Sequence, residues 1–228
     1  ITFKAEDVPA LGWRLYRIAN EKALAVKDSA ANAKVMENEF LKAVINGNGT
    51  IDLLDKRSKR VMKGLHLFED SGDCGGPWNR AEPDSNPVFT TRNAKAKVSV
   101  VAENGLFSRR KICIPFRVPV DVTKDEKGRM SATRVLPIET IVTLNAGSDQ
   151  LEFETTIDNT VRSHRLRVIL PSGLKGARTS EAESPFDVAS RPIRTPGKDE
   201  YGFGRFDFNP WNKQAPITTN PQISFMDV

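Results

Sequence analysis

Pairs of carboxylates are the residues of this 228-residue sequence that could most directly do chemistry, because two neighbouring acids can serve as proton donor and proton acceptor. Such pairs are plentiful, for example Asp70 with Asp73, Glu82 with Asp84, and Asp199 with Glu200. Spacing alone does not single out one of them as an acid–base couple. Two of the pairs lie in one run, FEDSGDCGGPWNRAEPDSNP (68–87). This run is too polar and too often interrupted by glycine and proline for a helix or a strand, so we predict a long loop.

The two histidines are predicted to be structural. His66 stands between two leucines on an apparent strand, and His164 stands at the entry to another, far away in the sequence. Neither has a cysteine or carboxylate at the spacing of a metal site. The chain also has no G-x-S-x-G elbow, and the glycines of SGDCGGPW do not lead from a strand into a helix as a phosphate-binding loop does.

The composition is that of a soluble globular protein, with 39% hydrophobic and 28% charged residues. The net charge of +5 is spread along the chain and accompanies no nucleic-acid motif, so we expect no nucleic-acid partner. No apolar run approaches the roughly 18 residues that span a membrane, and no signal peptide is visible. Two cysteines without a disulfide pattern favour a reducing compartment, so we expect a cytoplasmic location.

Alternating apolar and polar residues dominate the chain from Val35 onward. The strongest hairpin signal is the Asn48-Gly49 turn between two such runs. In HRLRVILPSG the alternation predicts Leu166, Val168 and Leu170 on the inward face. With about ten predicted strands and no firm helix, the fold class is all-β, and a two-sheet sandwich is the natural way to bury such strands.

The ends suggest how the chain is divided. Residues 1–30 combine a strand-like opening with an Ala- and Lys-rich stretch, and we interpret them as the end of a preceding domain and a linker. Residues 31–228 then form the β-sandwich domain. Because both ends read as strands without polar tails, we expect a piece of a longer polypeptide.

Several motifs resemble one known family when taken in order. MENEFLKAVINGNGTIDLLDKRSKR resembles a hairpin of the form LENEFLRV…DGTL…DK.TG, and the 68–87 run follows it as a loop ending in an aromatic residue and proline. TTIDNTVRSHRLRVILPSGL, SPFDVASRPI and NPQISFMDV also have counterparts in the same order. These motifs resemble the C-terminal β-domain of glycoside hydrolase family 38, the α-mannosidases.

The resemblance implies a galactose-mutarotase-like β-supersandwich that is incomplete at both ends. It implies a retaining α-mannosidase as the parent protein, with mannose-containing glycans as substrates and the N-terminal catalytic domain as an intramolecular partner. The zinc ligands and the nucleophilic aspartate of the family lie in that other domain. We therefore expect no catalytic or zinc-binding residue on this chain and no turnover by it alone.

Four substrate-binding candidates follow from motif position. Arg191, after Phe186-Asp187, matches the family's pocket arginine, and its fixed fork of donors suits sugar hydroxyls. Trp78 could provide an apolar platform for a pyranose ring, and Asp73 and Asn79 could contact hydroxyls. Each has a structural alternative: an inter-domain ion pair for the arginine, packing on its own sandwich for the tryptophan, and fastening of the loop for the other two.

Two positions depart from the family pattern. Gly76 stands where the family often has a second loop aspartate, and Ser163 stands where it has the aspartate before His-Arg. Two other functions stay open: a non-catalytic β-sandwich that binds carbohydrate or protein through its loops, and a mutarotase-like epimerase. The epimerase would need a histidine and a carboxylate facing one concave sheet, which two isolated histidines hardly provide.

Overall fold

The computed structural model describes residues 3, 5, 7–17, 32–75, 81–193 and 226–227, and within these ranges the regular structure is almost entirely antiparallel strand. The strands are β1 (Val35–Glu37), β2 (Leu41–Ile45), β3 (Ile51–Asp55), β4 (Val61–Leu65), β5 (Leu67–Gly72), β6 (Phe89–Thr90), β7 (Lys97–Glu103), β8 (Phe107–Pro119), β9 (Thr133–Asn145), β10 (Leu151–Ile157), β11 (His164–Ile169), β12 (Thr179–Ser184), β13 (Asp187–Pro192) and β14 (Met226–Asp227). One short 3-10 helix, η1 (Thr91–Asn93), follows β6. The all-β prediction is confirmed.

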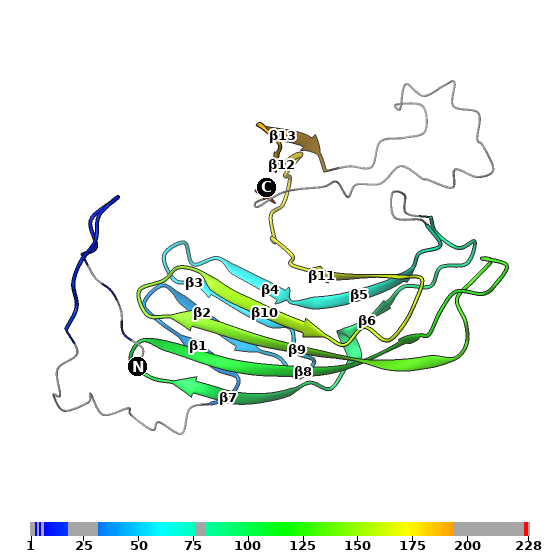
Figure 1. Ribbon diagram of the computed structural model, residues 1–228, viewed down its shortest axis with the longest axis horizontal. Coiled ribbons are helices and arrows are strands. Elements are labelled where there is room, and N and C mark those ends of the chain that lie inside the picture. Colours follow the sequence, from blue (N-terminus) through cyan, green and yellow to red (C-terminus); the bar gives the residue numbers. More distant parts are fainter. Residues whose placement is uncertain are drawn as a thin grey trace.

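The strands form four sheets, with the orders β1-β2-β3-β4, β10-β9-β8-β7, β11-β5-β6 and β13-β12-β14. In Figure 1 the first three make up the body of the molecule, and the β12–β13 hairpin stands outside it. The longest pairing joins β8 to β9, from Phe107 opposite Asn145 to Pro119 opposite Thr133. The hairpin predicted at Asn48-Gly49 is present as β2–β3, and β7–β8 and β9–β10 form antiparallel pairs of the same kind.

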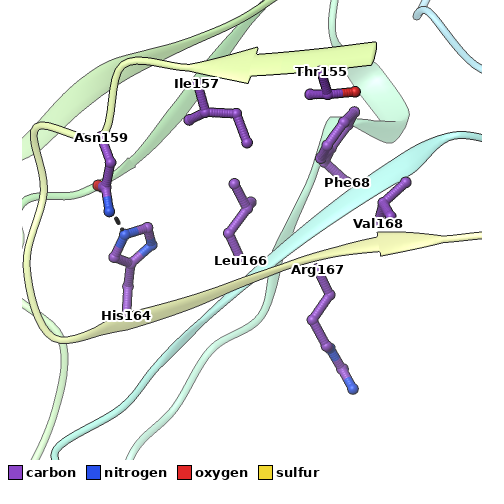
Figure 2. Close-up of a pocket in the computed structure, with 8 residues that line it drawn as sticks. All are labelled: Phe68, Thr155, Ile157, Asn159, His164, Leu166, Arg167 and Val168. Carbon is purple, nitrogen blue, oxygen red and sulfur yellow. Dashed lines mark hydrogen bonds between the residues drawn. The ribbon is translucent and has the colours of Figure 1, made fainter. Parts of the chain in front are cut away.

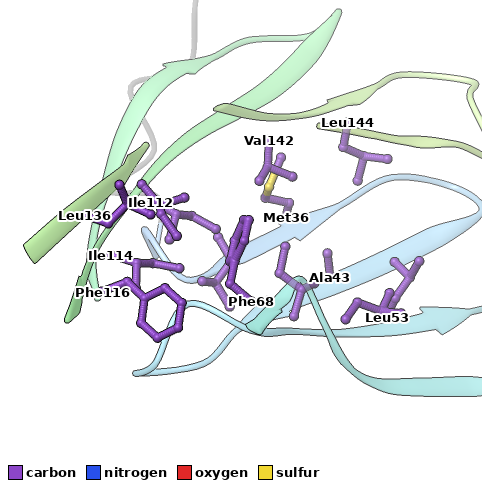
Figure 3. Close-up of a cluster of buried hydrophobic side chains, with 14 of the residues drawn as sticks. Met36, Ala43, Leu53, Phe68, Ile112, Ile114, Phe116, Leu136, Val142 and Leu144 are labelled. Carbon is purple, nitrogen blue, oxygen red and sulfur yellow. The ribbon is translucent and has the colours of Figure 1, made fainter. Parts of the chain in front are cut away.

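The core lies between the sheet of β1 to β4, together with β5, and the sheet of β7 to β10 (Figure 3). Every second side chain of β8 from Ser108 to Val118 is buried, as period-2 alternation requires when one face of a strand is covered. The buried apolar residues of the two layers are Met36, Leu41, Ala43, Ile45, Ile51, Leu53, Leu65 and Phe68 on one side, and Ile112, Ile114, Phe116, Val118, Leu136, Ile138, Val142 and Leu144 on the other.

Polar contacts fix the relative position of the two layers. The Asn38 amide donates to the carbonyl oxygens of Asn145 at 2.8 Å and Ser148 at 2.7 Å, so the turn before β2 is tied to the β9–β10 turn. Arg110 is fully buried within β8, where it pairs with Glu103 of β7 and donates to the Val35 carbonyl of β1 at 3.1 Å. The charge is therefore compensated within the core.

A kink at His66 separates β4 from β5. His66 has a φ of 67° and is 1% exposed. Its Nδ1 lies 2.9 Å from the Gly49 carbonyl and its Nε2 lies 2.9 Å from the Thr140 hydroxyl. The left-handed backbone turns the chain from one sheet into the next, and the side chain joins the β2–β3 turn to β9, in keeping with the structural role expected from the sequence.

Two sequence-based expectations were wrong. The 68–87 run is not a loop from its start, because residues up to Gly72 belong to β5 and Asp70 is fully buried there. The inward face predicted for β11 is only partly buried, because Val168 is 48% and Leu170 is 55% exposed. Residues 18–31, which hold most of the expected linker, lie outside the described residues.

Candidate functional site

Two of the segments that resemble family motifs lie side by side. Strand β11 pairs antiparallel with β5, from His164 opposite Gly72 to Ile169 opposite Leu67. The loop that follows β5 and the loop that precedes β11 therefore leave the sheet at the same end. The Asp73 backbone N–H donates to the Ser163 carbonyl at 2.9 Å and holds the two loops together.

A buried ionic network supports this end of the sheet. Asp70, fully buried on β5, lies with Oδ1 2.5 Å from Nη1 of Arg129 and with Oδ2 2.5 Å from Nδ1 of His164. The Arg129 side chain is 1% exposed and its guanidinium lies over the Phe89 ring, 5.4 Å from the centroid. Two basic groups around one buried carboxylate lower the energetic cost of excluding it from water.

The network continues to the surface through His164. Its Nε2 lies 3.1 Å from Oδ1 of Asn159, an oxygen that also accepts the Val161 backbone N–H at 3.3 Å. The network therefore runs from the 121–131 turn through β5 to the 158–163 loop. It fixes the positions of three segments that are distant in the sequence.

Ser163 connects the same loop to the 121–131 turn. The Ser163 hydroxyl donates to the Asp121 carboxylate, and this hydrogen bond is the main cause of the lowered pKa of Asp121. The backbone N–H of Val122 and the charge of Arg162 act in the same direction. Ser163 also has a φ of 47°, in the left-handed region. Its departure from the family aspartate thus removes a second carboxylate from the neighbourhood of Asp121.

The loop after β5 is closed at its base by Asp73. Its Oδ1 accepts the backbone N–H of Gly75 at 2.9 Å and that of Ala81 at 3.1 Å. The Asn86 amide reinforces the base, since its Oδ1 accepts the Gly72 N–H at 2.6 Å. This geometry corresponds to the loop-fastening alternative for Asp73. It is also an Asx arrangement, in which an aspartate side chain accepts from backbone N–H groups nearby in the chain.

Of the other three predicted site residues, the structure describes only Arg191. Trp78 and Asn79 lie outside the described residues. Arg191 is half-buried on β13, opposite Ser180 of β12, in a different sheet from Asp73. Asp73 is therefore the candidate that the described residues place against the 158–163 loop, which precedes His164.

A pocket of about 440 Å³ opens between β10 and β11. Figure 2 shows Thr155 and Ile157 reaching down from β10 and Leu166 and Val168 reaching up from β11, while Arg167 points away from the gap. The remaining lining residues are Phe68 at the inner wall and Asn159 and His164 at one end. The pocket is open to solvent, and it is mostly apolar with one polar end.

Sequence reasoning missed the network of Asp70, Arg129, His164 and Asn159. No spacing signal could have found it, because strand pairing and a turn bring its members together across the sequence. Within the described ranges, no three His, Cys, Asp or Glu side chains are grouped as a metal site would require. The described residues also include no helix long and apolar enough to cross a membrane.

The chain is similar to several known proteins. It is 28% identical over 172 residues to a protein named "Putative mannosylglycerate hydrolase" from Halalkalibacterium halodurans, a match that covers 69% of this chain and 19% of that protein. Among solved structures, an alpha-mannosidase from Enterococcus faecalis V583 is 31% identical with a TM-score of 0.68, over 71% of this chain and 20% of that one. A glycosyl hydrolase family 38 protein from Enterococcus faecalis gives 31% identity and a TM-score of 0.67, over 71% and 21%.

The chain thus spans about a fifth of the length of these relatives. Residues 36–220 match the family described as "Glycosyl hydrolases family 38 C-terminal domain", which is most of the sequence. The resemblance stated from the motifs is confirmed, and the chain belongs to the C-terminal domain of glycosyl hydrolase family 38.

Proposed function

We propose that this chain is the C-terminal β-domain of a retaining α-mannosidase-type glycoside hydrolase, where it supports the catalytic domain and helps to line the sugar pocket. The observation that carries the proposal is the match over 71% of the chain to an alpha-mannosidase structure, at 31% identity. The parent protein would hydrolyse an α-mannosidic bond in a mannose-containing glycan, with retention of configuration. It would act in the cytoplasm.

The proposed organisation follows the sequence expectations. Residues 1–30 would end a preceding domain, and 31–228 would belong to a β-supersandwich that other parts of the polypeptide complete. The described residues offer no group of ligands that fits zinc. In this proposal the N-terminal catalytic domain of the parent enzyme holds the zinc and the nucleophile.

The contribution proposed for this chain is rigid presentation of contact residues. Asp73 closes the base of the loop that carries Trp78 and Asn79, and the buried Asp70 network anchors the strand from which that loop departs. A loop anchored in this way can hold a sugar contact within the narrow tolerance that binding needs. Arg191 would donate to sugar hydroxyls from the β12–β13 hairpin.

The test is hydrolysis of an aryl α-mannoside with added zinc, by the 228-residue chain and by the longest polypeptide that its gene encodes. We expect activity in the long polypeptide alone. In that form Arg191→Ala and Trp78→Ala should lower kcat/KM by about 10- to 100-fold, the effect of losing one charged hydrogen bond or one apolar platform. Arg92→Ala, at an exposed arginine within η1, is the matched control and should leave kcat/KM unchanged.

A second candidate is a non-catalytic module that binds carbohydrate. The pocket between β10 and β11 favours it, because its polar end formed by Asn159 and His164 adjoins an apolar wall. Absence of hydrolysis by both polypeptides, together with saturable binding of methyl α-mannoside that Asn159→Ala abolishes, would favour this alternative. Hydrolysis by the short chain would contradict both.

A further inference from the structure

The turn between β12 and β13 has an unusual residue at its tip. Ser184 pairs with Asp187, so the loop consists of only two residues, Pro185 and Phe186. Phe186 has a φ of 64°. The second central position of a turn that begins with proline and continues at positive φ is normally glycine or asparagine, because a side chain there is strained.

Phe186 also contributes no burial to the described structure. Its relative exposure is 108%, so neither face of the ring is covered by the described residues. The hairpin strands pair with each other and with β14, and in Figure 1 the hairpin stands outside the body made by β1 to β11. Both the strained backbone and the exposure of an apolar ring to water are unfavourable, and among the described residues no contact of the ring compensates for them.

Other exposed apolar side chains occur in the same part of the sequence. They are Leu170 at 55%, Leu174 at 42%, Val188 at 48% and Ile193 at 41%. On β13, Asp187 and Arg191 lie on the face opposite Val188, because successive side chains of a strand alternate between its two faces. An aromatic side chain is the commonest anchor of a protein–protein hot spot.

We propose that Phe186 is an anchor that inserts into an apolar pocket of another domain of the same polypeptide. The partner is inferred from length, because the matched part of this chain makes up only about a fifth of the similar proteins, so most of their length lies outside it. A sugar-stacking ring would instead be backed on one face by its own domain. A ring free on both faces at the tip of a hairpin fits an enclosing protein pocket. This inference rests on the longer polypeptide of the proposed function, but not on its activity.

The test compares Phe186→Gly and Phe186→Asn in the 228-residue chain and in the longest polypeptide that the gene encodes. Both new residues tolerate positive φ, so in the short chain the thermal midpoint should stay the same or rise. In the long polypeptide the same changes remove the anchor, and the midpoint should fall by about 2–4 °C. Val61→Thr, at a valine 48% exposed on β4, is the matched control and should change neither midpoint.

A second measurement does not depend on the stability of a variant. Phe186→Cys should react with a maleimide at the rate of a free thiol in the short chain and at least about tenfold more slowly in the long polypeptide, since docking excludes the reagent. Equal reactivity in both polypeptides, or an equal change of midpoint in both, would refute the anchor. An active long polypeptide whose midpoint is unaffected by Phe186→Gly would refute the anchor and leave the proposed function intact. A long polypeptide that is inactive, but whose midpoint falls on Phe186→Gly, would refute the proposed function and support the anchor.

Discussion

Replacement of His66 by phenylalanine gives the sharpest test of the fold. The Gly49 carbonyl can only accept, so Nδ1 of His66 carries the proton and Nε2 accepts from the Thr140 hydroxyl. Burial lowers the pKa of His66, and the hydrogen bond to Gly49 offsets part of this effect. The histidine is therefore held neutral in the folded protein.

The size of the effect follows from what phenylalanine keeps and loses. The His66 ring meets Phe68 edge-on at 4.8 Å and stacks on Phe153 at 5.5 Å, contacts that a phenylalanine ring can retain. The Thr140 hydroxyl keeps its bond to Thr155. The Gly49 carbonyl loses its histidine donor, and a buried acceptor without a partner costs about 1–3 kcal/mol. We expect a loss of that size in the free energy of unfolding at about pH 7.5.

The pH dependence gives the control. Because the folded-state pKa of His66 is lowered, the unfolded state takes up the proton first as the pH falls. The stability due to neutral His66 is present above the unfolded pKa of about 6.5 and is lost below it, at up to about 1.4 kcal/mol per pH unit until the folded pKa is reached. The variant lacks this loss, so the difference between the two proteins should shrink between about pH 7.5 and pH 5.

The assay is urea unfolding followed by tryptophan fluorescence at both pH values. His164 is present in both proteins, so its contribution cancels in the difference. A difference that stays constant from about pH 7.5 to pH 5 would refute the conclusion that His66 is buried in its neutral form.

Three further substitutions test other parts of the structure. Ser163→Asp should lower the free energy of unfolding by about 1 kcal/mol at neutral pH, because it places a second carboxylate against Asp121, whereas the uncharged Ser163→Asn should not. In urea unfolding, the stabilities of the two variants should converge at low pH, where the carboxylates are protonated. Gly49→Ala should lower the free energy of unfolding, measured with urea, by about 2–5 kcal/mol, because φ is +87° and the new Cβ would lie 2.6 Å from the Cδ1 methyl of Ile114. Gly47→Ala is the control: nothing lies within 4 Å of its new Cβ, so the loss should be less than about 1 kcal/mol. Asp73→Ala should speed hydrogen exchange about tenfold at the two backbone amides that its carboxylate binds, and unchanged exchange there would contradict its role in closing the loop.

Local pattern was sufficient to predict much of the fold. The Asn48-Gly49 turn and the alternation along β7 to β10 indicated the strands that build the two layers. This was possible because side chains of a strand alternate between its two faces, so burial of one face appears as an apolar–polar alternation of adjacent residues. Local pattern did not predict that β5 continues to Gly72. Its central residue Asp70 is polar, and it is buried only because Arg129 and His164 reach it from other parts of the chain.

The same limit applies to the site. Asp73 could be identified as a loop-fastening residue because its partners are close in sequence. The network around Asp70 depends on the pairing of β5 with β11, which no local pattern specifies. Val168 and Leu170 alternate as inward residues would, yet they are exposed because β11 lines the edge of an open pocket. Periodicity indicates which residues share a face, not whether another layer covers that face.

The Asn38 contact has a consequence for how the chain is made. Its partner carbonyl at Ser148 lies 110 residues later, so this tie between the two layers can form only after that much more chain has been synthesised. At ribosomal rates of about 5–20 residues per second, the Asn38 amide waits roughly 5–20 s for this partner. Until then part of the apolar face of the first sheet lacks its cover, so slow translation should leave an aggregation-prone surface exposed for longer.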